Sequence, residues 1–223
     1  SWSWTVSPSA GVTITTPTLQ NPTMNFSTGG TYTITLTASN GAGPGSPSSQ
    51  VISVGTTPTV NVTSASQTVC AGSPVSFTAS GATTYSWTSG GGTGTVATYT
   101  PASLMVYTVT GTTGSCSGIR TATAYVNALP TVSITGVNAI CFGSSANLTG
   151  TGALTYTWNT SATTTSISVS PTLTTVYTTT GTAVNGCRNV FTKTVTVNAL
   201  PTINTSASSS IVCAGSNANL IAS

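Results

Sequence analysis

Apolar residues alternate with small polar residues along most of this chain. Residues 31–37 read Thr-Tyr-Thr-Ile-Thr-Leu-Thr, and residues 84–87 and 106–112 show similar alternation. A period of two residues is typical of β-strands with one buried face. Threonine suits such strands because it is β-branched and its hydroxyl can face water. Gly or Pro interrupts every candidate helix. We therefore predict an all-β protein.

The same landmarks return about every 71 residues, which indicates one folded unit repeated in tandem. Prolines, tryptophans and cysteines all follow this period, and the two cysteines of each full copy lie 46 positions apart. The landmarks are Pro58, Pro130 and Pro201; Trp87 and Trp158; Cys70, Cys141 and Cys213; and Cys116 and Cys187.

The repeats predict four segments. Residues 56–127 and 128–198 form two complete repeats, and residues 199–223 contain the first strands of another copy. Residues 1–55 form a variant unit without cysteine, which we expect to lack its first two strands. The linkers at 126–130 and 197–201 are both Val-Asn-Ala-Leu-Pro. Short linkers with proline are stiff, so we expect an elongated rod.

The chain has almost no charge, which bears on catalysis. Its 223 residues include three charged side chains, Arg120, Arg188 and Lys193, and no Asp, Glu or His. A typical soluble domain carries about 25% charged residues. Acid–base catalysis usually draws on His, Glu or Asp, and Ser–His–Asp and Cys–His systems need histidine. We therefore expect no enzyme and no catalytic residue.

The same composition disfavours other kinds of site. Calcium and magnesium are bound mainly by carboxylates, and zinc needs clustered ligands, whereas the cysteines here are dispersed. We expect no metal and no cofactor. Three scattered cations give no basic surface for nucleic acid. No apolar run reaches the roughly 18 residues of a membrane span.

Three tryptophans lie in corresponding strands, each two residues after another aromatic residue. Alternation places both aromatics of a pair on one face. We expect Trp4, Trp87 and Trp158 to lie on central strands as core anchors; an aromatic platform for carbohydrate is the alternative. We also expect Tyr32, Tyr107 and Tyr177 to be structural, because each opens a strand after a turn as in the tyrosine corner of β-sandwiches.

The five cysteines indicate an oxidising compartment. Pairing within repeats joins Cys70 to Cys116 and Cys141 to Cys187, and leaves Cys213 for a partner beyond residue 223. We place Cys70 in the turn between the first two strands and Cys116 in the last hairpin, and these lie at opposite ends of a simple sandwich. The alternative is a staggered bond, Cys70–Cys187, between neighbouring repeats. Both pairings stay open at this point.

Two resemblances add to this interpretation. Residues 21–43, NPTMNFSTGGTYTITLTASNGAG, resemble PKD-type immunoglobulin-like domains. The motifs VCAGS at 69–73, TYSW at 84–87 and GSC at 114–116, with their counterparts in the next copy, resemble immunoglobulin-like repeats of giant secreted proteins of Bacteroidetes-type gliding bacteria. That group includes gliding-motility adhesins and other cargo of the type IX secretion system. The resemblance implies an extracellular or cell-surface filament.

We therefore expect a non-catalytic stalk of a large secreted adhesin, used for surface attachment or gliding motility. Its implied partners are the rest of its own chain, other copies in filaments, surface glycans and the secretion machinery. Two alternatives come from other classes: a carbohydrate-binding or accessory region of a large secreted protein, and the subunit of a self-assembling fibre, for which near-zero charge lowers colloidal repulsion.

Overall fold

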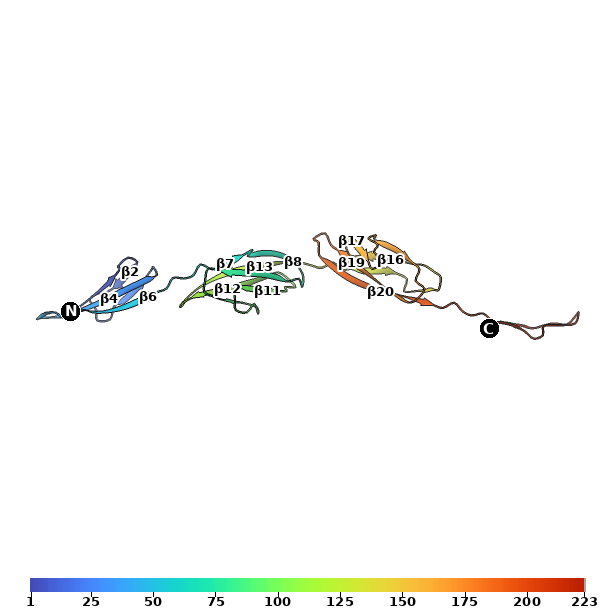
Figure 1. Ribbon diagram of the computed structural model, residues 1–223, viewed down its shortest axis with the longest axis horizontal. Coiled ribbons are helices and arrows are strands. Elements are labelled where there is room, and N and C mark those ends of the chain that lie inside the picture. The colour runs from blue at the N-terminus through green and yellow to red at the C-terminus, as the bar shows by residue number, and fades with distance from the viewer. Residues whose placement is uncertain (223) are drawn as a thin grey trace. The chain divides into compact units, whose positions relative to one another are not determined.

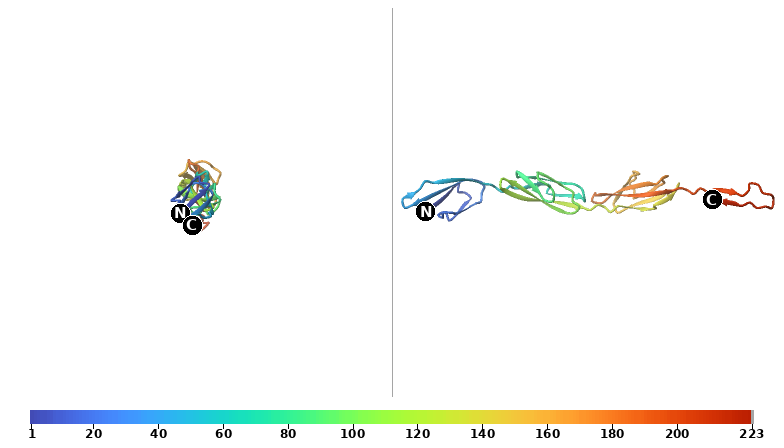
Figure 2. Two further views of the ribbon diagram at one scale, coloured as in Figure 1. Left: turned by 90° about the vertical axis from the view of Figure 1, so that its left-hand side faces the viewer. Right: turned by 90° about the horizontal axis from the view of Figure 1, so that it is seen from below.

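The computed structural model describes residues 1–222, and every regular element in that range is a β-strand (Figure 1). Figure 2 shows the same strands and connecting loops from two further sides. The all-β prediction is thus confirmed. Within the described part of the chain, no helix is long and apolar enough to cross a membrane. The chain divides into two compact units, Ser1–Asn127 and a second that begins at Ala128. The finer division into four segments stays a prediction.

The first strands form a thin, partly covered assembly. β1 and β6 both pair antiparallel with the long strand β4, β5 adds a short pairing at its end, and β2 and β3 form a separate hairpin. Among residues 1–54, Tyr32 alone is buried, and the other inward side chains are half-buried. The strands are β1 (Trp2–Ser7), β2 (Val12–Thr15), β3 (Thr23–Phe26), β4 (Gly30–Asn40), β5 (Gly43–Pro44) and β6 (Ser48–Val54).

The next seven strands form a sandwich of two sheets. One sheet has the order β10-β12-β13-β8, and the other has the order β11-β9-β7. All pairs are antiparallel except β8 with β13, which is parallel. The strands are β7 (Asn61–Thr63), β8 (Ser66–Cys70), β9 (Val75–Ser80), β10 (Thr84–Trp87), β11 (Val96–Tyr99), β12 (Met105–Thr113) and β13 (Cys116–Asn127).

The following seven strands repeat this arrangement. Their sheets have the orders β17-β19-β20-β15 and β14-β16-β18, and β15 runs parallel to β20. The strands are β14 (Ser133–Gly136), β15 (Ala139–Cys141), β16 (Ala146–Thr151), β17 (Thr155–Trp158), β18 (Ser166–Val169), β19 (Thr175–Thr182) and β20 (Arg188–Asn198). Beyond them, β21 (Thr205–Ala207) and β22 (Leu220–Ala222) pair as an exposed two-stranded piece. We call the two sandwiches the first and second repeat.

Each repeat closes its own core between the two sheets. In the first repeat Phe77 of β9 is fully buried, and its ring centroid lies 5.9 Å from that of Tyr107 on β12. Tyr99 of β11 stacks on Tyr107 at 3.7 Å. In the second repeat Leu148 replaces Phe77 and packs in a core that contains Trp158. Because alternate residues of both sheets point inward, each repeat is a self-contained immunoglobulin-like sandwich.

Two features differ from the sequence-based expectation. The tryptophan strands, β1 with Trp4, β10 with Trp87 and β17 with Trp158, lie at the edges of their sheets and not at the centre. The cysteines Cys70 and Cys141 lie at the ends of short strands and not in a turn between the first two strands. These strands, β8 and β15, lie in the other sheet from the strand that precedes them, and each extends the edge beside the last strand of its repeat.

Candidate functional site

Cys70 occupies a well-defined place beside the last strand of the first repeat. It is the final residue of β8 and stands opposite Asn127, the final residue of β13, in the parallel register. A tight turn follows at once: the Ala71 amide donates to the Asn127 carbonyl at 2.9 Å, and the Ser73 amide donates to the Cys70 carbonyl at 2.9 Å. Gly72 has φ of +75°, which favours glycine at this position.

Cys141 occupies the same place in the second repeat. It ends β15 opposite Asn198, which ends β20. The Phe142 amide donates to the Asn198 carbonyl at 2.9 Å, and the Ser144 amide donates to the Cys141 carbonyl at 3.0 Å. Gly143 has φ of +84°. The backbone around the two cysteines is therefore built in one way, and we call each of these regions the cysteine end of its repeat.

The other two cysteines lie at the opposite end of each sandwich. Cys116 is the first residue of β13, and Cys187 directly precedes β20. The turn at Cys187 is closed by hydrogen bonds: its amide donates to Asn185 Oδ1 at 3.0 Å, and the Ala183 amide donates to its carbonyl at 2.8 Å. Cys187 is fully buried, whereas Cys116 is half-buried. We call these turns the cysteine hairpins.

The structure decides between the two pairing schemes. Cys70 and Cys187 are disulfide-bonded, whereas Cys116, Cys141 and Cys213 carry free thiols. The predicted within-repeat pairs Cys70–Cys116 and Cys141–Cys187 are therefore wrong. The two bonded cysteines are the pair named in the staggered alternative, Cys70–Cys187.

The length of β13 gives the physical reason for this correction. Cys116 begins the strand, and Cys70 lies beside its last residue, Asn127. At about 3.3 Å per residue, the two ends of this strand are roughly 35 Å apart. A disulfide requires Cα atoms within about 7 Å. The same argument applies to the second repeat, where β20 separates Cys187 from Cys141.

The tryptophans hold the loops that follow their strands. Trp87 and Trp158 are buried, and Trp4 is half-buried. Each indole N–H donates to a backbone carbonyl further along the chain: Trp4 to Leu19 at 3.0 Å, Trp87 to Gly94 at 3.0 Å and Trp158 to Thr164 at 2.8 Å. In the two repeats the indole ring is buried and its one N–H donor is used, so Trp87 and Trp158 serve as structural anchors.

The tyrosines behave differently from the expectation in one respect. Tyr32, Tyr107 and Tyr177 are all buried, and the Tyr32 hydroxyl donates to the Thr28 carbonyl at 2.9 Å. In the two repeats, however, the corresponding backbone bonds are made by Tyr85 and Tyr156. The Tyr156 hydroxyl donates to the Ala153 carbonyl at 3.1 Å and accepts from the Ala153 amide at 2.9 Å.

Tyr85 makes the equivalent pair of bonds with Ala82, both at 2.8 Å. The sequence analysis treated Tyr85 only as the aromatic residue two positions before Trp87, on the same face of the strand. A small residue three positions before the tyrosine was the signal that could have identified this turn, because the hydroxyl reaches its backbone.

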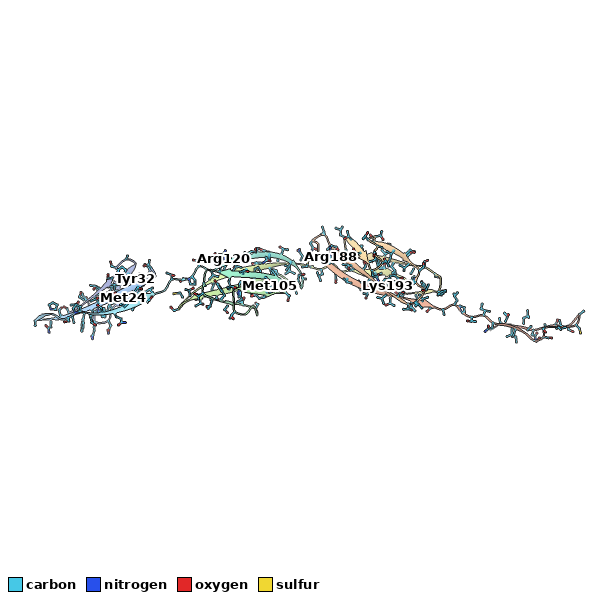
Figure 3. All side chains as sticks on the ribbon, viewed as in Figure 1. Met24, Tyr32, Met105, Arg120, Arg188 and Lys193 are labelled. Atoms are coloured by element: carbon cyan, nitrogen blue, oxygen red, sulfur yellow. The ribbon has the colours of Figure 1, made fainter. Side chains whose placement is uncertain are left out.

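The three cations are spread over the two repeats, as Figure 3 shows for Arg120, Arg188 and Lys193. Both arginines are exposed. The Lys193 ammonium donates to Asn138 Oδ1 at 2.6 Å, which ties β20 to the residue before β15. Among residues 1–222, no three His, Cys, Asp or Glu side chains gather into a possible metal site.

An apolar groove at the cysteine end of the second repeat includes Phe142, the residue after Cys141, in its lining. It has a volume of about 360 Å³ and is lined by Phe142, Thr172, Leu173, Val197, Ala199 and Leu200. Three of these side chains are large and well exposed: Phe142 by 52%, Leu173 by 77% and Leu200 by 58%. Sequence reasoning did not identify this groove, because its residues come from three separate parts of the second unit.

No family model and no curated protein matches this chain. Solved tandem immunoglobulin structures are similar in fold. A variant of a three-domain titin fragment is 15% identical, with 90% of this chain and 88% of that chain aligned at a TM-score of 0.37. A Ca²⁺-stabilised adhesin with which an Antarctic bacterium binds ice is also 15% identical, over 81% of this chain and 60% of that one, with a TM-score of 0.34. The structure of Sidekick-1 immunoglobulin domains 1–4 is 15% identical, with 89% of this chain and 67% of that chain aligned at a TM-score of 0.28.

Proposed function

We propose that this chain is a non-catalytic stalk segment of a large secreted, cell-surface adhesin, of the kind exported by type IX secretion and used in attachment or gliding. The observation that carries the proposal is the repetition itself. Two consecutive sandwiches have one strand order, separate cores and the linker sequence Val-Asn-Ala-Leu-Pro after each. Such units can be multiplied along a chain without a new fold.

The strand order suits a segment that carries tension. When the Cys70–Cys187 disulfide is reduced, force applied along the chain enters the first repeat before β7 and β8 and leaves at Asn127, the end of β13. Because β8 and β13 are parallel neighbours, this force pulls them in opposite directions along their length. Their hydrogen bonds are then loaded together in shear and do not open one at a time. β15 and β20 give the second repeat the same arrangement.

The cysteines favour an extracellular location. A disulfide persists outside the cell, whereas cytosolic thiols are kept reduced. The Cys70–Cys187 bond spans 117 positions, the difference between the two residue numbers. While this disulfide is intact, the residues between Cys70 and Cys187 cannot be stretched out when the chain is pulled from its ends.

Single-molecule pulling under reducing conditions tests the stalk proposal. The repeats at 56–127 and 128–198 contain 72 and 71 residues, counting both ends, so they release almost equal lengths. Each step approaches about 240 Å at roughly 3.4 Å per residue, less the length of the folded repeat. Two such unfolding steps, at forces well above the force needed to stretch an unfolded chain, support the proposal. Smooth extension without steps contradicts it.

A carbohydrate-binding role for residues 1–127 is the second candidate, and one observation favours it. Trp4 is half-buried and lines a mainly apolar groove with Ile34 and Leu36 on the sheet of β1, β4 and β6. Exposed aromatic rings can stack on sugar rings. A glycan array probed with the 223-residue chain and with its Trp4→Ala variant tests this role. Signals that the variant loses support it, and equal signals or none exclude it.

A further inference from the structure

We propose that the cysteine end of the second repeat is a docking site for the cysteine hairpin of a third repeat, which it binds through a disulfide to Cys141. The ligand is thus a further copy of the repeat itself. The inference goes beyond the stalk function, since it concerns how one repeat recognises the next and holds whether or not the chain bears load.

The first argument is the equivalence of Cys70 and Cys141. Both end a short strand parallel to the last strand of their repeat, and both are followed by the same turn with the same two hydrogen bonds. Cys70 is disulfide-bonded, and Cys187 is the other bonded cysteine. Cys141 is exposed and carries a thiol. Cys70 of the first repeat bonds to the hairpin cysteine of the second repeat. One repeat further along, the same pairing joins Cys141 of the second repeat to the hairpin cysteine of a third repeat.

The second argument is the apolar groove at the cysteine end of the second repeat, which Phe142, the residue after Cys141, helps to line. Phe142, Leu173 and Leu200 form an apolar groove in which each of them is more than half exposed. Exposed apolar side chains that gather in one place mark a contact surface more often than isolated ones do. At the positions of Phe142 and Leu173, the first repeat has Ala71 and Ser103. At these two positions the second repeat therefore has larger apolar side chains than the first.

The third argument identifies the occupant. Residues 199–223 repeat the start of the pattern, with Cys213 placed 72 positions after Cys141. The Ser216 amide donates to the Cys213 carbonyl at 3.0 Å, and Gly215 has φ of +89°. The turn of the cysteine end is therefore already built in the third copy, so a third repeat is the partner that the chain itself specifies.

The chemistry is a two-electron oxidation. The thiols of Cys141 and of the incoming hairpin each lose a proton, and a sulfur–sulfur bond forms between them. A low-molecular-weight disulfide, such as oxidised glutathione, accepts the two electrons and protons and is released as two thiols. The reaction proceeds by exchange through a mixed disulfide, which the exposure of Cys141 permits.

A lengthened chain tests this proposal. Residues 199–223 are replaced by a second copy of residues 128–198, and the protein is refolded in a glutathione redox buffer. Free thiols are counted by alkylation and mass spectrometry. We expect Cys141→Ser to add one free thiol, because the appended hairpin cysteine loses its partner. The matched control places serine at the equivalent of Cys141 in the appended copy, and we expect it to remove one free thiol.

The opposite pattern overturns the proposal. If the appended hairpin pairs within its own repeat, serine in the appended copy adds a thiol and Cys141→Ser removes one. If no new bond forms, both variants remove one thiol. A further variant tests the groove: Leu173→Ser lowers the cross-linked fraction severalfold at fixed redox potential, because it removes apolar contact. Leu154→Ser, an equally polar change at a side chain 67% exposed elsewhere in the repeat, leaves that fraction unchanged. Equal fractions for both variants exclude the groove from the interface.

Discussion

Thr179 holds in the second repeat the place that Val109 holds in the first. Both are fully buried in the strand next to the tryptophan strand, where Trp158 faces Thr179 and Trp87 faces Val109. The difference is one hydroxyl group, and Thr179 Oγ1 is buried without a hydrogen-bond partner. The second repeat therefore contains a polar group that the first repeat has replaced by a methyl group.

This relationship predicts that Thr179→Val stabilises the second repeat. Burial of a hydroxyl without a partner costs about 1–3 kcal/mol, and the valine at the same place in the first repeat shows that the shape is tolerated. Urea unfolding, followed by a probe in the second repeat, measures the change. The reverse substitution, Val109→Thr, should destabilise the first repeat by a similar amount. A neutral or destabilising effect of Thr179→Val would show that the hydroxyl is satisfied in solution.

The reassigned tyrosine turn predicts unequal effects of two tyrosine substitutions. Tyr156→Phe removes two hydrogen bonds to Ala153 and leaves a partly buried amide and carbonyl without partners, which costs about 1–3 kcal/mol. Tyr177→Phe removes a hydroxyl from the position where the sequence alone placed this bond, and we expect a smaller loss. Thermal unfolding of the two variants compares them. A larger loss for Tyr177→Phe would reverse the assignment.

Buried tyrosines predict loss of stability in alkali. Burial, together with the neighbouring Tyr107, raises the pKa of Tyr99 above its ordinary value of 10.0, and burial alone raises the pKa of Tyr107. The folded repeat thus keeps these protons at a pH where the unfolded chain releases them. Stability is fully present below pH of about 10 and falls as pH rises through the folded-state pKa values.

Urea unfolding of the first repeat between pH 8 and pH 11 checks this expectation. Replacement of both Tyr99 and Tyr107 by phenylalanine should flatten the dependence, although it also removes the hydrogen bond from Tyr99 to the Thr88 carbonyl. The slope of stability against pH is therefore the quantity to compare, and not stability at one pH. An unchanged slope in the double variant would place the effect elsewhere.

Periodicity predicted the all-β fold well, because alternation of apolar and small polar residues is the mark of strands with one buried face. The strands β8 and β15 were missed because neither shows alternation of apolar and polar residues: β15 covers only Ala139–Cys141, and β8, Ser66–Cys70, has its two apolar residues side by side at its end. That omission also misplaced Cys70 and Cys141. The expectation that Cys70 and Cys116 lie at opposite ends of the sandwich did not depend on these strands, and the length of β13 agrees with it.

Threonine explains why the polar part of the core was harder to predict. Residues 178–180 are all threonine, and the strand places Thr179 inward while its two neighbours lie at half-buried positions. β-branched threonine fits either face of a pleated sheet, so a run of three has no pattern of polarity. The edge position of the tryptophan strands could likewise not be predicted. Alternation indicates which face of a strand is buried, but not which strands lie beside it.

The extensible length with and without reductant tests the central claim most directly. The claim is that consecutive self-contained sandwiches are joined by the Cys70–Cys187 disulfide. Single chains are pulled from both ends, first oxidised and then with a reducing agent. We expect reduction to add roughly 400 Å of extensible length, which is 117 positions at about 3.4 Å each. A Cys70→Ser chain should show the full length without reductant. Equal lengths before and after reduction would contradict the account.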